Sequence, residues 1–170
     1  MILKNYKKSG YSLVEAVFYI SLLTLFFIII INTIISFIKP YREILVLRYT
    51  ERSGLDSMER MTRDIRGATS VNSGSSTLGS HPGVLTIVST FGGISTTTRF
   101  YIDNGVLKVD VNGTYAGPLT SSKATVTNLV FRQMSNSRSS AVKVDVTISS
   151  SIGSTTRTKK YYSTTIIKGI

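Results

Sequence analysis

The chain has 170 residues, of which 20 are Lys or Arg and 9 are Asp or Glu, so its formal net charge is +11. It contains no Cys and a single His, which excludes a disulfide framework, a thiolate metal site and a His-rich zinc site. A Ser-His-Asp triad would have to use His81. The length suggests one domain, or one domain with an appendage.

The N-terminal region is basic and then strongly apolar. Residues 1–10 contain three lysines and no acid, and residues 11–38 contain a single charged side chain, Glu15. Residues 16–38 are uncharged, and a helix of that length measures about 34 Å, enough to cross a hydrocarbon core of about 30 Å. This segment is therefore predicted to be a transmembrane helix.

Ordinary targeting segments explain this region incompletely. A secretory signal has a shorter apolar run and small residues at a cleavage site beyond it, and residues 34–41 offer no such site. A simple signal anchor accounts for the length but leaves Glu15 unexplained, because a carboxylate at the bilayer centre costs about 2.5–3.5 kcal/mol. Glu15 either lies near the interface, where it reaches the headgroup region, or it marks a function.

The string Lys7-Lys8-Ser9-Gly10-Tyr11-Ser12-Leu13-Val14-Glu15, followed directly by the apolar run, resembles the class III signal of type IV pilins and type II secretion pseudopilins. The resemblance implies that a membrane prepilin peptidase cuts between Gly10 and Tyr11 and methylates the new amine of Tyr11. A glycine at the cut suits a tight protease site because it has no side chain. The resemblance also implies that Lys7 and Lys8 belong to the leader, and that Glu15 meets the N-terminal amine of a neighbouring subunit during assembly.

This resemblance implies a pilin-like architecture in four parts. Residues 1–10 are the leader peptide, 11–38 the transmembrane and assembly helix, 39–67 an amphipathic continuation, and 68–170 a β-rich globular domain. The expected partners are the prepilin peptidase, other pilin or pseudopilin subunits, the inner-membrane assembly platform and, before assembly, membrane lipid. The chain is expected in the bacterial inner membrane as a single-pass protein with its globular domain outside the cytoplasm, and then in a pilus or pseudopilus.

Helical periodicity continues beyond the apolar run. Six apolar residues, spaced mostly by three or four, predict a stripe that packs on the following sheet: Ile44, Leu47, Leu55, Met58, Met61 and Ile65. Two ion pairs one turn apart are predicted, Asp56–Arg60 and Glu59–Arg63. Gly67 is predicted to end the helix.

From residue 68 onward, a polar loop over residues 68–83 is followed by alternating apolar and polar residues. About six mostly antiparallel strands are predicted, and Asn104-Gly105 marks a tight hairpin. The expected strands cover residues 84–90, 99–103, 106–111, 126–131, 142–149 and 158–167. Together with the long N-terminal helix they predict an α+β fold, in which the helix packs on an antiparallel sheet.

Finer similarities lie within the same family. Residues 58–66, 100–107, 128–131 and 142–144 resemble minor pilins and J-type minor pseudopilins in their apolar pattern. The chain departs from the disulfide-closed C-terminal loop of many type IV pilins, since it has no cysteine. The pattern leaves open whether the filament is a pilus, a secretion pseudopilus or a DNA-uptake pseudopilus.

No candidate active site is found in the sequence, and the chain is predicted to be a non-enzyme without a cofactor or metal. His81 lies in a predicted turn and is interpreted as a loop histidine. Beyond residue 67 the acids are Asp103, Asp110 and Asp145, at a turn or on polar strand faces, which disfavours a catalytic carboxylate pair. Residues 112–114 match a glycan acceptor pattern that is common by chance.

The remaining feature is positive charge. Residues 68–170 contain ten Lys and Arg against three Asp, a net charge of +7. Arg157, Lys159 and Lys160 stand beside two tyrosines, and such a surface is suited to phosphate contacts and base stacking with nucleic acid. The favoured interpretation is a solvated strand that keeps the protein soluble. The alternative function is a membrane-anchored binding module whose basic β domain captures a ligand such as DNA.

Overall fold

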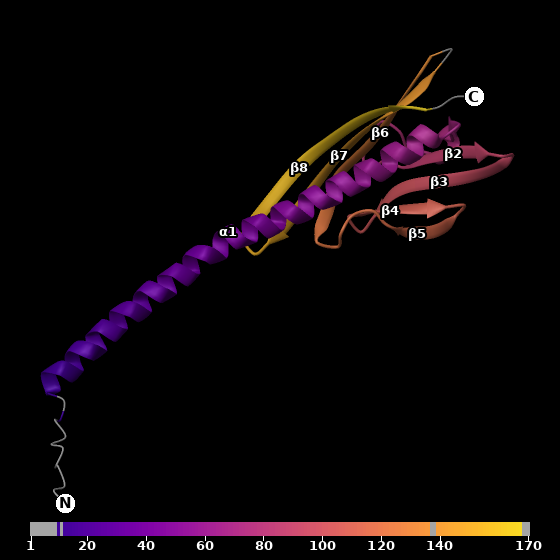
Figure 1. The fold of residues 1–170 in the computed structure, drawn as a ribbon. Helices are drawn as coiled ribbons and strands as arrows, with labels where there is room; N and C mark the ends of the chain where they lie inside the picture. The colour runs from indigo at the N-terminus through magenta and orange to yellow at the C-terminus, as the bar shows by residue number, and fades with distance from the viewer. Residues whose placement is uncertain (1–9, 11, 137–138, 168–170) are drawn as a thin grey trace, which may run out of the picture. The chain divides into compact units, whose positions relative to one another are not determined.

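The computed structural model of the protein describes residues 10, 12–136 and 139–167. The chain forms two compact units, Met1–Tyr41 and Arg42–Ile170. From Leu13 onward the first unit is helical, and the second unit contains the rest of that helix and every strand that the structure describes (Figure 1).

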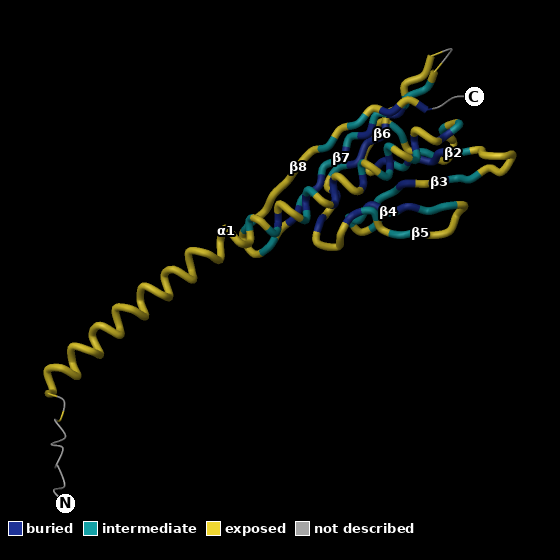
Figure 2. Tube along the Cα trace, viewed as in Figure 1, coloured by how far each residue is buried: buried dark blue, intermediate teal, exposed yellow. Residues whose placement is uncertain are grey.

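One helix, α1, runs without interruption from Leu13 to Gly67 and includes Pro40 (Figure 1). Its part in the first unit exposes every residue, apolar ones included (Figure 2). Four hydroxyl groups in this part donate hydrogen bonds of 2.8–2.9 Å to carbonyl oxygens one turn earlier, so they need no water. Among the described residues, α1 is the one helix long and apolar enough to cross a membrane.

The second unit contains two antiparallel sheets. The five-stranded sheet has the order β1-β2-β3-β4-β5 and the three-stranded sheet the order β6-β7-β8. The strands are β1 (Ser70–Val71), β2 (Leu85–Phe91), β3 (Ile94–Asp103), β4 (Val106–Val111), β5 (Thr114–Pro118), β6 (Ala124–Ser135), β7 (Ser140–Ile152) and β8 (Thr155–Ile166). A short 3-10 turn, η1 (Ser73–Ser75), follows β1. The predicted α+β class, with a long N-terminal helix on antiparallel strands, is confirmed.

Three hairpins of the five-stranded sheet turn on residue pairs with positive φ. Asn104 and Gly105 have φ of 50° and 75°, which confirms the predicted hairpin between β3 and β4. The same backbone conformation occurs at Gly92-Gly93 and at Asn112-Gly113. Strand β5 follows Asn112-Gly113 and is absent from the strands predicted above. The Asn-Gly dipeptide before it is typical of a tight hairpin and could have indicated this strand.

A hydrophobic core lies inside the second unit, between α1 and both sheets (Figure 2). The predicted alternation is confirmed, because inward-facing residues of the strands are buried while their neighbours are exposed or half-buried. The largest fully buried side chains of the core cluster include Met61, Ile65, Leu85, Ile87, Phe100, Leu107, Leu129, Phe131 and Ile148.

The face that α1 turns toward the sheets differs from the predicted apolar stripe. Met61 and Ile65 are buried as expected, but Ile44, Leu47 and Leu55 are 57%, 45% and 62% exposed. The helix instead buries a row dominated by small residues: Val46, Thr50, Ser53, Gly54, Ser57, Met61 and Ile65. Small side chains let the backbone of a helix approach a sheet closely. The spacing of apolar residues does not indicate such a face, because most of the buried residues here are small or polar.

The ion pairs of the helix also differ from the predicted ones. Asp56 lies 3.5 Å from Arg52, and Asp64 accepts a 2.7 Å hydrogen bond from Arg60. In both pairs the basic residue precedes the acidic residue by four positions in the chain. Glu59 makes no ion pair within 4 Å among the described residues. The predicted Asp56–Arg60 and Glu59–Arg63 pairs are therefore wrong, because each basic side chain has more than one acid within one turn and the surroundings decide between them.

Candidate functional site

The residues of the predicted cleavage signal are only partly within the described structure. Lys7, Lys8 and Tyr11 lie outside the described residues. Gly10 is exposed, and a Cβ placed on it would meet none of the described residues within 4 Å. Its φ also lies outside the left-handed range that only glycine adopts easily. The described part of the fold therefore supplies no reason for a glycine at residue 10.

Glu15 lies in the first turn of α1, where the helix dipole favours a negative charge. Its carboxylate accepts a hydrogen bond of 3.3 Å from the hydroxyl group of Tyr19, one turn later. Both side chains are exposed. The single acid of the apolar segment thus has one neutral partner on its own helix and no ion pair within 4 Å among the described residues.

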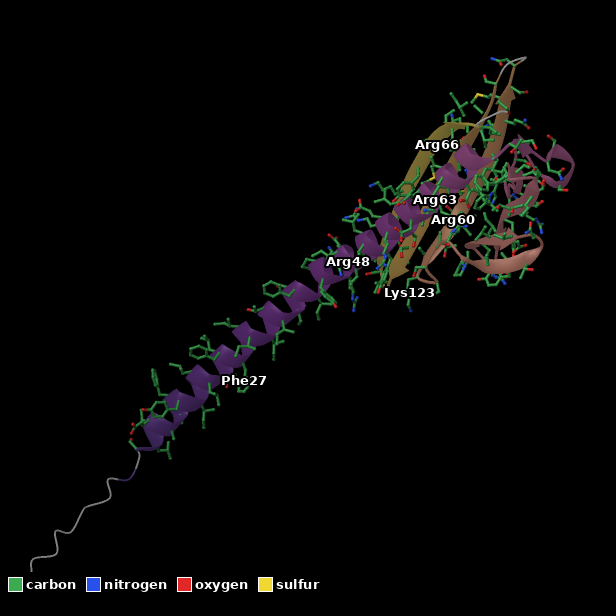
Figure 3. All side chains as sticks on the ribbon, turned by 45° about the vertical axis from the view of Figure 1, so that its right-hand side comes forward. Phe27, Arg48, Arg60, Arg63, Arg66 and Lys123 are labelled. Atoms are coloured by element: carbon green, nitrogen blue, oxygen red, sulfur yellow. The ribbon has the colours of Figure 1, made fainter. Side chains whose placement is uncertain are left out.

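The apolar segment presents large side chains on all sides. Leucine, isoleucine and phenylalanine residues between residues 13 and 38 are 43–81% exposed (Figure 2). Phe27 is one of them, and Figure 3 shows the sticks of this segment standing out around the helix. Soluble monomers rarely expose a contiguous apolar surface of this extent, so the segment requires lipid or another protein around it.

The predicted basic residues of β8 are divided between two faces of the strand. Arg157 lies 3.8 Å from Glu43, and Lys159 donates a 2.8 Å hydrogen bond to Glu51, so both are paired with acids of α1. The bond to Glu51 raises the pKa of the Lys159 ammonium above its usual value. Lys160 alternates to the opposite face and makes no ion pair within 4 Å in the described structure. The three residues therefore do not form one continuous cationic surface.

Tyr161 joins β8 to α1. Its hydroxyl group donates a hydrogen bond of 3.1 Å to the backbone carbonyl of Thr50, and its ring lies directly against Gly54. Burial raises the pKa of the Tyr161 phenol above its usual value. This contact explains why the helix contains a glycine at an interior position.

The outward face of β3 and β4 carries a polar cluster that the sequence analysis did not predict. The hydroxyl group of Tyr101 donates a 3.0 Å hydrogen bond to Asp110, and the guanidinium of Arg99 lies 4.9 Å from the centre of the Tyr101 ring. Burial, and then the bond to Asp110, raises the pKa of the Tyr101 phenol. Lys108 donates a 2.5 Å hydrogen bond to Asp103 on the same face. The alternation of side chains along each strand predicts that these residues share one face of the sheet. Which residues lie opposite one another depends on the register of β3 and β4.

His81 has a structural role in a loop, as the sequence suggested. The backbone N–H of Leu129 donates a 3.0 Å hydrogen bond to Nδ1 of His81, which ties residues 79–83 to β6. Among the described residues, no group of three or more His, Cys, Asp or Glu is placed to hold a metal ion. Asn112, in the glycan acceptor pattern, accepts a 2.8 Å hydrogen bond from the backbone N–H of Thr97.

Comparisons of the sequence with protein-family models, with curated proteins and with solved structures give no match.

Proposed function

We propose that this chain is a structural subunit of a type IV pilus or of a type II secretion-like pseudopilus. A prepilin peptidase processes it at the cytoplasmic side of the inner membrane, and an assembly platform then extracts it through its N-terminal helix into the filament or its tip. One observation carries the proposal: Gly10 and Glu15 stand at the spacing of the prepilin signal, directly before a long helix with exposed apolar side chains.

The environment of Gly10 supports this proposal. None of the described residues would clash with a side chain at residue 10, so this part of the fold does not require the glycine. A requirement imposed by a processing enzyme would explain its presence, since a peptide bond after glycine fits a narrow protease site.

The environment of Glu15 supports it as well. The carboxylate lies in an apolar segment, and the Tyr19 hydroxyl group is its one hydrogen-bond partner among the described residues. An ammonium at the processed N-terminus of a neighbouring subunit would pair with it, and burial of either charge alone would be costly. Glu15 then sets the register of assembly and has no catalytic role. The apolar pattern of residues 58–66, 100–107, 128–131 and 142–144 is similar to that of minor pilins and of J-type minor pseudopilins.

The direct test is the intact mass and N-terminal sequence of the chain expressed with and without a prepilin peptidase. The expected product begins at Tyr11 and carries one additional methyl group. Gly10→Val is expected to remain uncut, while Gly67→Ala, outside the signal, is expected to be processed normally. An unprocessed Met1 terminus in the presence of an active peptidase would make the chain a simple membrane-anchored β domain.

A second test addresses assembly. Glu15→Gln removes the charge within the apolar segment and is expected to abolish incorporation into filaments without preventing cleavage. Glu59→Gln is the matched control, since Glu59 is exposed on the same helix and makes no ion pair within 4 Å in the part of the chain that the structure describes. Equal incorporation of both variants would contradict the assembly role of Glu15.

The alternative is a membrane-anchored module that captures DNA through its basic β domain, and the net charge of +7 over residues 68–170 favours it. The ion pairs of Arg157 and Lys159 weigh against it, because these two cations are already compensated. A gel-shift series with single-stranded and duplex DNA over increasing salt separates the two, since phosphate binding weakens steeply with salt. No shift at low salt excludes the DNA module.

A further inference from the structure

Strand β8 is a long, regular sheet edge. All twelve of its residues pair with β7 without a register shift, and in the described structure no strand pairs with its other side. The strand contains no proline and no bulge, which are common devices for protecting an edge. It therefore presents a continuous row of backbone donors and acceptors.

The other edges of the two sheets are protected. The outer side of β6 is closed by backbone hydrogen bonds of 2.7–2.9 Å from Gly79 to Phe131, from Gly83 to Leu129, and from Val126 to Gly105. Strand β1 has two residues, and β5 has five, ends in a proline and pairs with β4 through a register shift. Of the described edges, β8 is the long one left open.

The register identifies which backbone groups of β8 face outward. The N–H of Ile167 donates a 2.8 Å hydrogen bond to the carbonyl of Ser140, one residue beyond the last pair of β7 and β8. Bonded and non-bonded pairs alternate along an antiparallel ladder. Odd-numbered residues of β8 therefore bond to β7, and the N–H groups of Lys160, Tyr162 and Thr164 point to the free edge.

A groove of about 710 Å³ lies beside this edge, between β8 and helical residues of the same unit. Its helix side carries Leu55, which is 62% exposed, and the half-buried Met58. Tyr161 and Ser163 line its strand side with side chains that face the helix, whereas the ring of Tyr162 lies on the opposite face of the sheet, beside the ammonium of Lys143. An extended segment bound along the edge would thus find hydrogen-bond partners on one side and apolar contacts on the other.

The charges around the groove indicate that a bound partner carries negative charge. Arg63 and Arg66 line it from the helix (Figure 3), and Arg66 makes no ion pair within 4 Å among the described residues. Strand β8 contains no acid; its Arg157 and Lys159 are paired with acids of α1, and Lys160 makes no ion pair within 4 Å among the described residues. Of the described residues that line the groove, Glu59 is the one acid. A second copy of β8 would bring cations and no acid of its own strand to this edge, so it would offer Arg63 and Arg66 no carboxylate.

We propose that the free edge of β8 and the adjoining groove bind an acidic, extended segment of another protein, which adds to the three-stranded sheet as a fourth strand. Backbone hydrogen bonds to Lys160, Tyr162 and Thr164 hold the segment, and its carboxylates meet Arg63 and Arg66. The inference does not rest on filament assembly, since every residue involved belongs to the 42–170 unit.

The experiment selects binders from a random library of displayed peptides with the length of β8, 12 residues, on the full chain in detergent micelles. Recovered peptides are expected to be rich in Asp and Glu. Labelled copies of the strongest peptide then measure affinity by fluorescence anisotropy. Recovery of no binder, or of binders without an acidic bias, would overturn the proposal.

Two matched pairs of variants test the site. Thr164→Pro removes one outward N–H while remaining compatible with an edge strand, and is expected to weaken binding roughly tenfold or more; Thr164→Val keeps that N–H and is expected to bind normally. Arg66→Glu is expected to weaken binding roughly tenfold, whereas Arg48→Glu, on the same helix but outside the groove (Figure 3), is expected to leave it unchanged. Equal effects within either pair would overturn the proposal.

Amide hydrogen exchange measured by NMR provides an independent readout. On addition of the peptide, the N–H groups of Lys160, Tyr162 and Thr164 are expected to become protected. Those of the odd-numbered residues between them are protected already.

A single-stranded oligonucleotide is the remaining probe. If it binds wild type and Thr164→Pro equally and displaces the peptide without protecting these amides, the surface is a polyanion site and the proposal fails.

Discussion

At the scale of single residues, the contact between Gly54 and Tyr161 shows how a glycine in the helix lets the side chain of a neighbouring strand pack directly against the helix backbone. A Cβ at residue 54 would lie 2.6 Å from the hydroxyl oxygen of Tyr161 and closer still to its ring. Glycine lowers helix propensity by about 1 kcal/mol relative to alanine. The helix tolerates this cost because the ring packs against it and bonds to Thr50.

A double-mutant cycle tests this contact. Gly54→Ala is expected to lower the free energy of unfolding by about 1–2 kcal/mol, because overpacking against the ring outweighs the gain in helix propensity. In a Tyr161→Ala background, Gly54→Ala is expected to raise the free energy of unfolding by about 1 kcal/mol, because the ring no longer opposes the gain in helix propensity. Denaturant unfolding of the full chain in micelles, followed by circular dichroism, measures both. An increase in stability in both backgrounds would contradict the close packing of the ring.

Tyr101 supplies a pH-dependent prediction at the same scale. Burial and the bond to Asp110 raise the pKa of this phenol above its ordinary value of 10.0. A raised pKa means that the folded state favours the protonated form, so the stabilisation is fully present below about pH 10 and is lost as the pH rises through the folded pKa. The stability difference between wild type and Tyr101→Phe is therefore expected to be constant up to about pH 10 and to shift against wild type above it. Thermal unfolding midpoints across this range measure it, and a constant difference would refute the prediction.

At the scale of elements, the helix in the second unit has two different faces. The face toward the sheets consists largely of small residues, while the apolar side chains of Ile44, Leu47 and Leu55 remain exposed. Hydroxyl groups on the buried face have hydrogen-bond partners: Thr50 donates to the carbonyl of Val46 on the same helix, and Ser53 accepts from the N–H of Ser121, which lies far along the chain. Close approach with satisfied polar groups replaces the large apolar stripe that periodicity predicted.

The loop at residues 79–83 is a second element whose role depends on one side chain. His81 accepts the N–H of Leu129, a fully buried residue, and helps to close the outer edge of β6. His81→Ala is expected to lower the free energy of unfolding by about 1–3 kcal/mol, because this N–H would lose its acceptor. Ser80→Ala, at an exposed neighbouring position, is expected to have little effect. Equal unfolding midpoints for the two variants in denaturant would argue against the role of His81.

At the scale of the whole molecule, the division into two units separates two environments. Every buried hydrophobic residue of the described structure lies between Val46 and Ile167. The described part of the first unit is exposed throughout. The second unit therefore contains its own core, whereas the first exposes an apolar surface that only lipid or protein can cover.

This division predicts the behaviour of a shortened chain. A chain that begins at Arg42 is expected to remain in the aqueous phase after membrane sedimentation and to keep the β-sheet signal of the full chain in circular dichroism. The full chain is expected to sediment with membranes and to require detergent for extraction. A shortened chain that is unfolded, or that still sediments with membranes, would show that residues 1–41 contribute to the fold of the β-rich unit.

Local patterns were sufficient for much of this architecture. The uncharged run after Glu15 predicted the apolar helix, Gly67 predicted its end, and Asn104-Gly105 predicted a hairpin, because each depends on backbone or solvation preferences of adjacent residues. The alternation in β4 and β7 predicted which side chains are buried. Strands β1 and β5 were missed because they are short and carry few apolar residues.

The candidate sites divide in the same way. The cleavage and assembly signal is a linear string, so the sequence by itself determined the proposal built on Gly10 and Glu15. Only the tertiary structure decided that Arg157 and Lys159 pair with acids of the helix while β8 keeps a free edge. The physical reason is distance along the chain: spacing reports what a segment prefers, whereas ion pairs, buried faces and open edges depend on residues that folding brings together from far apart.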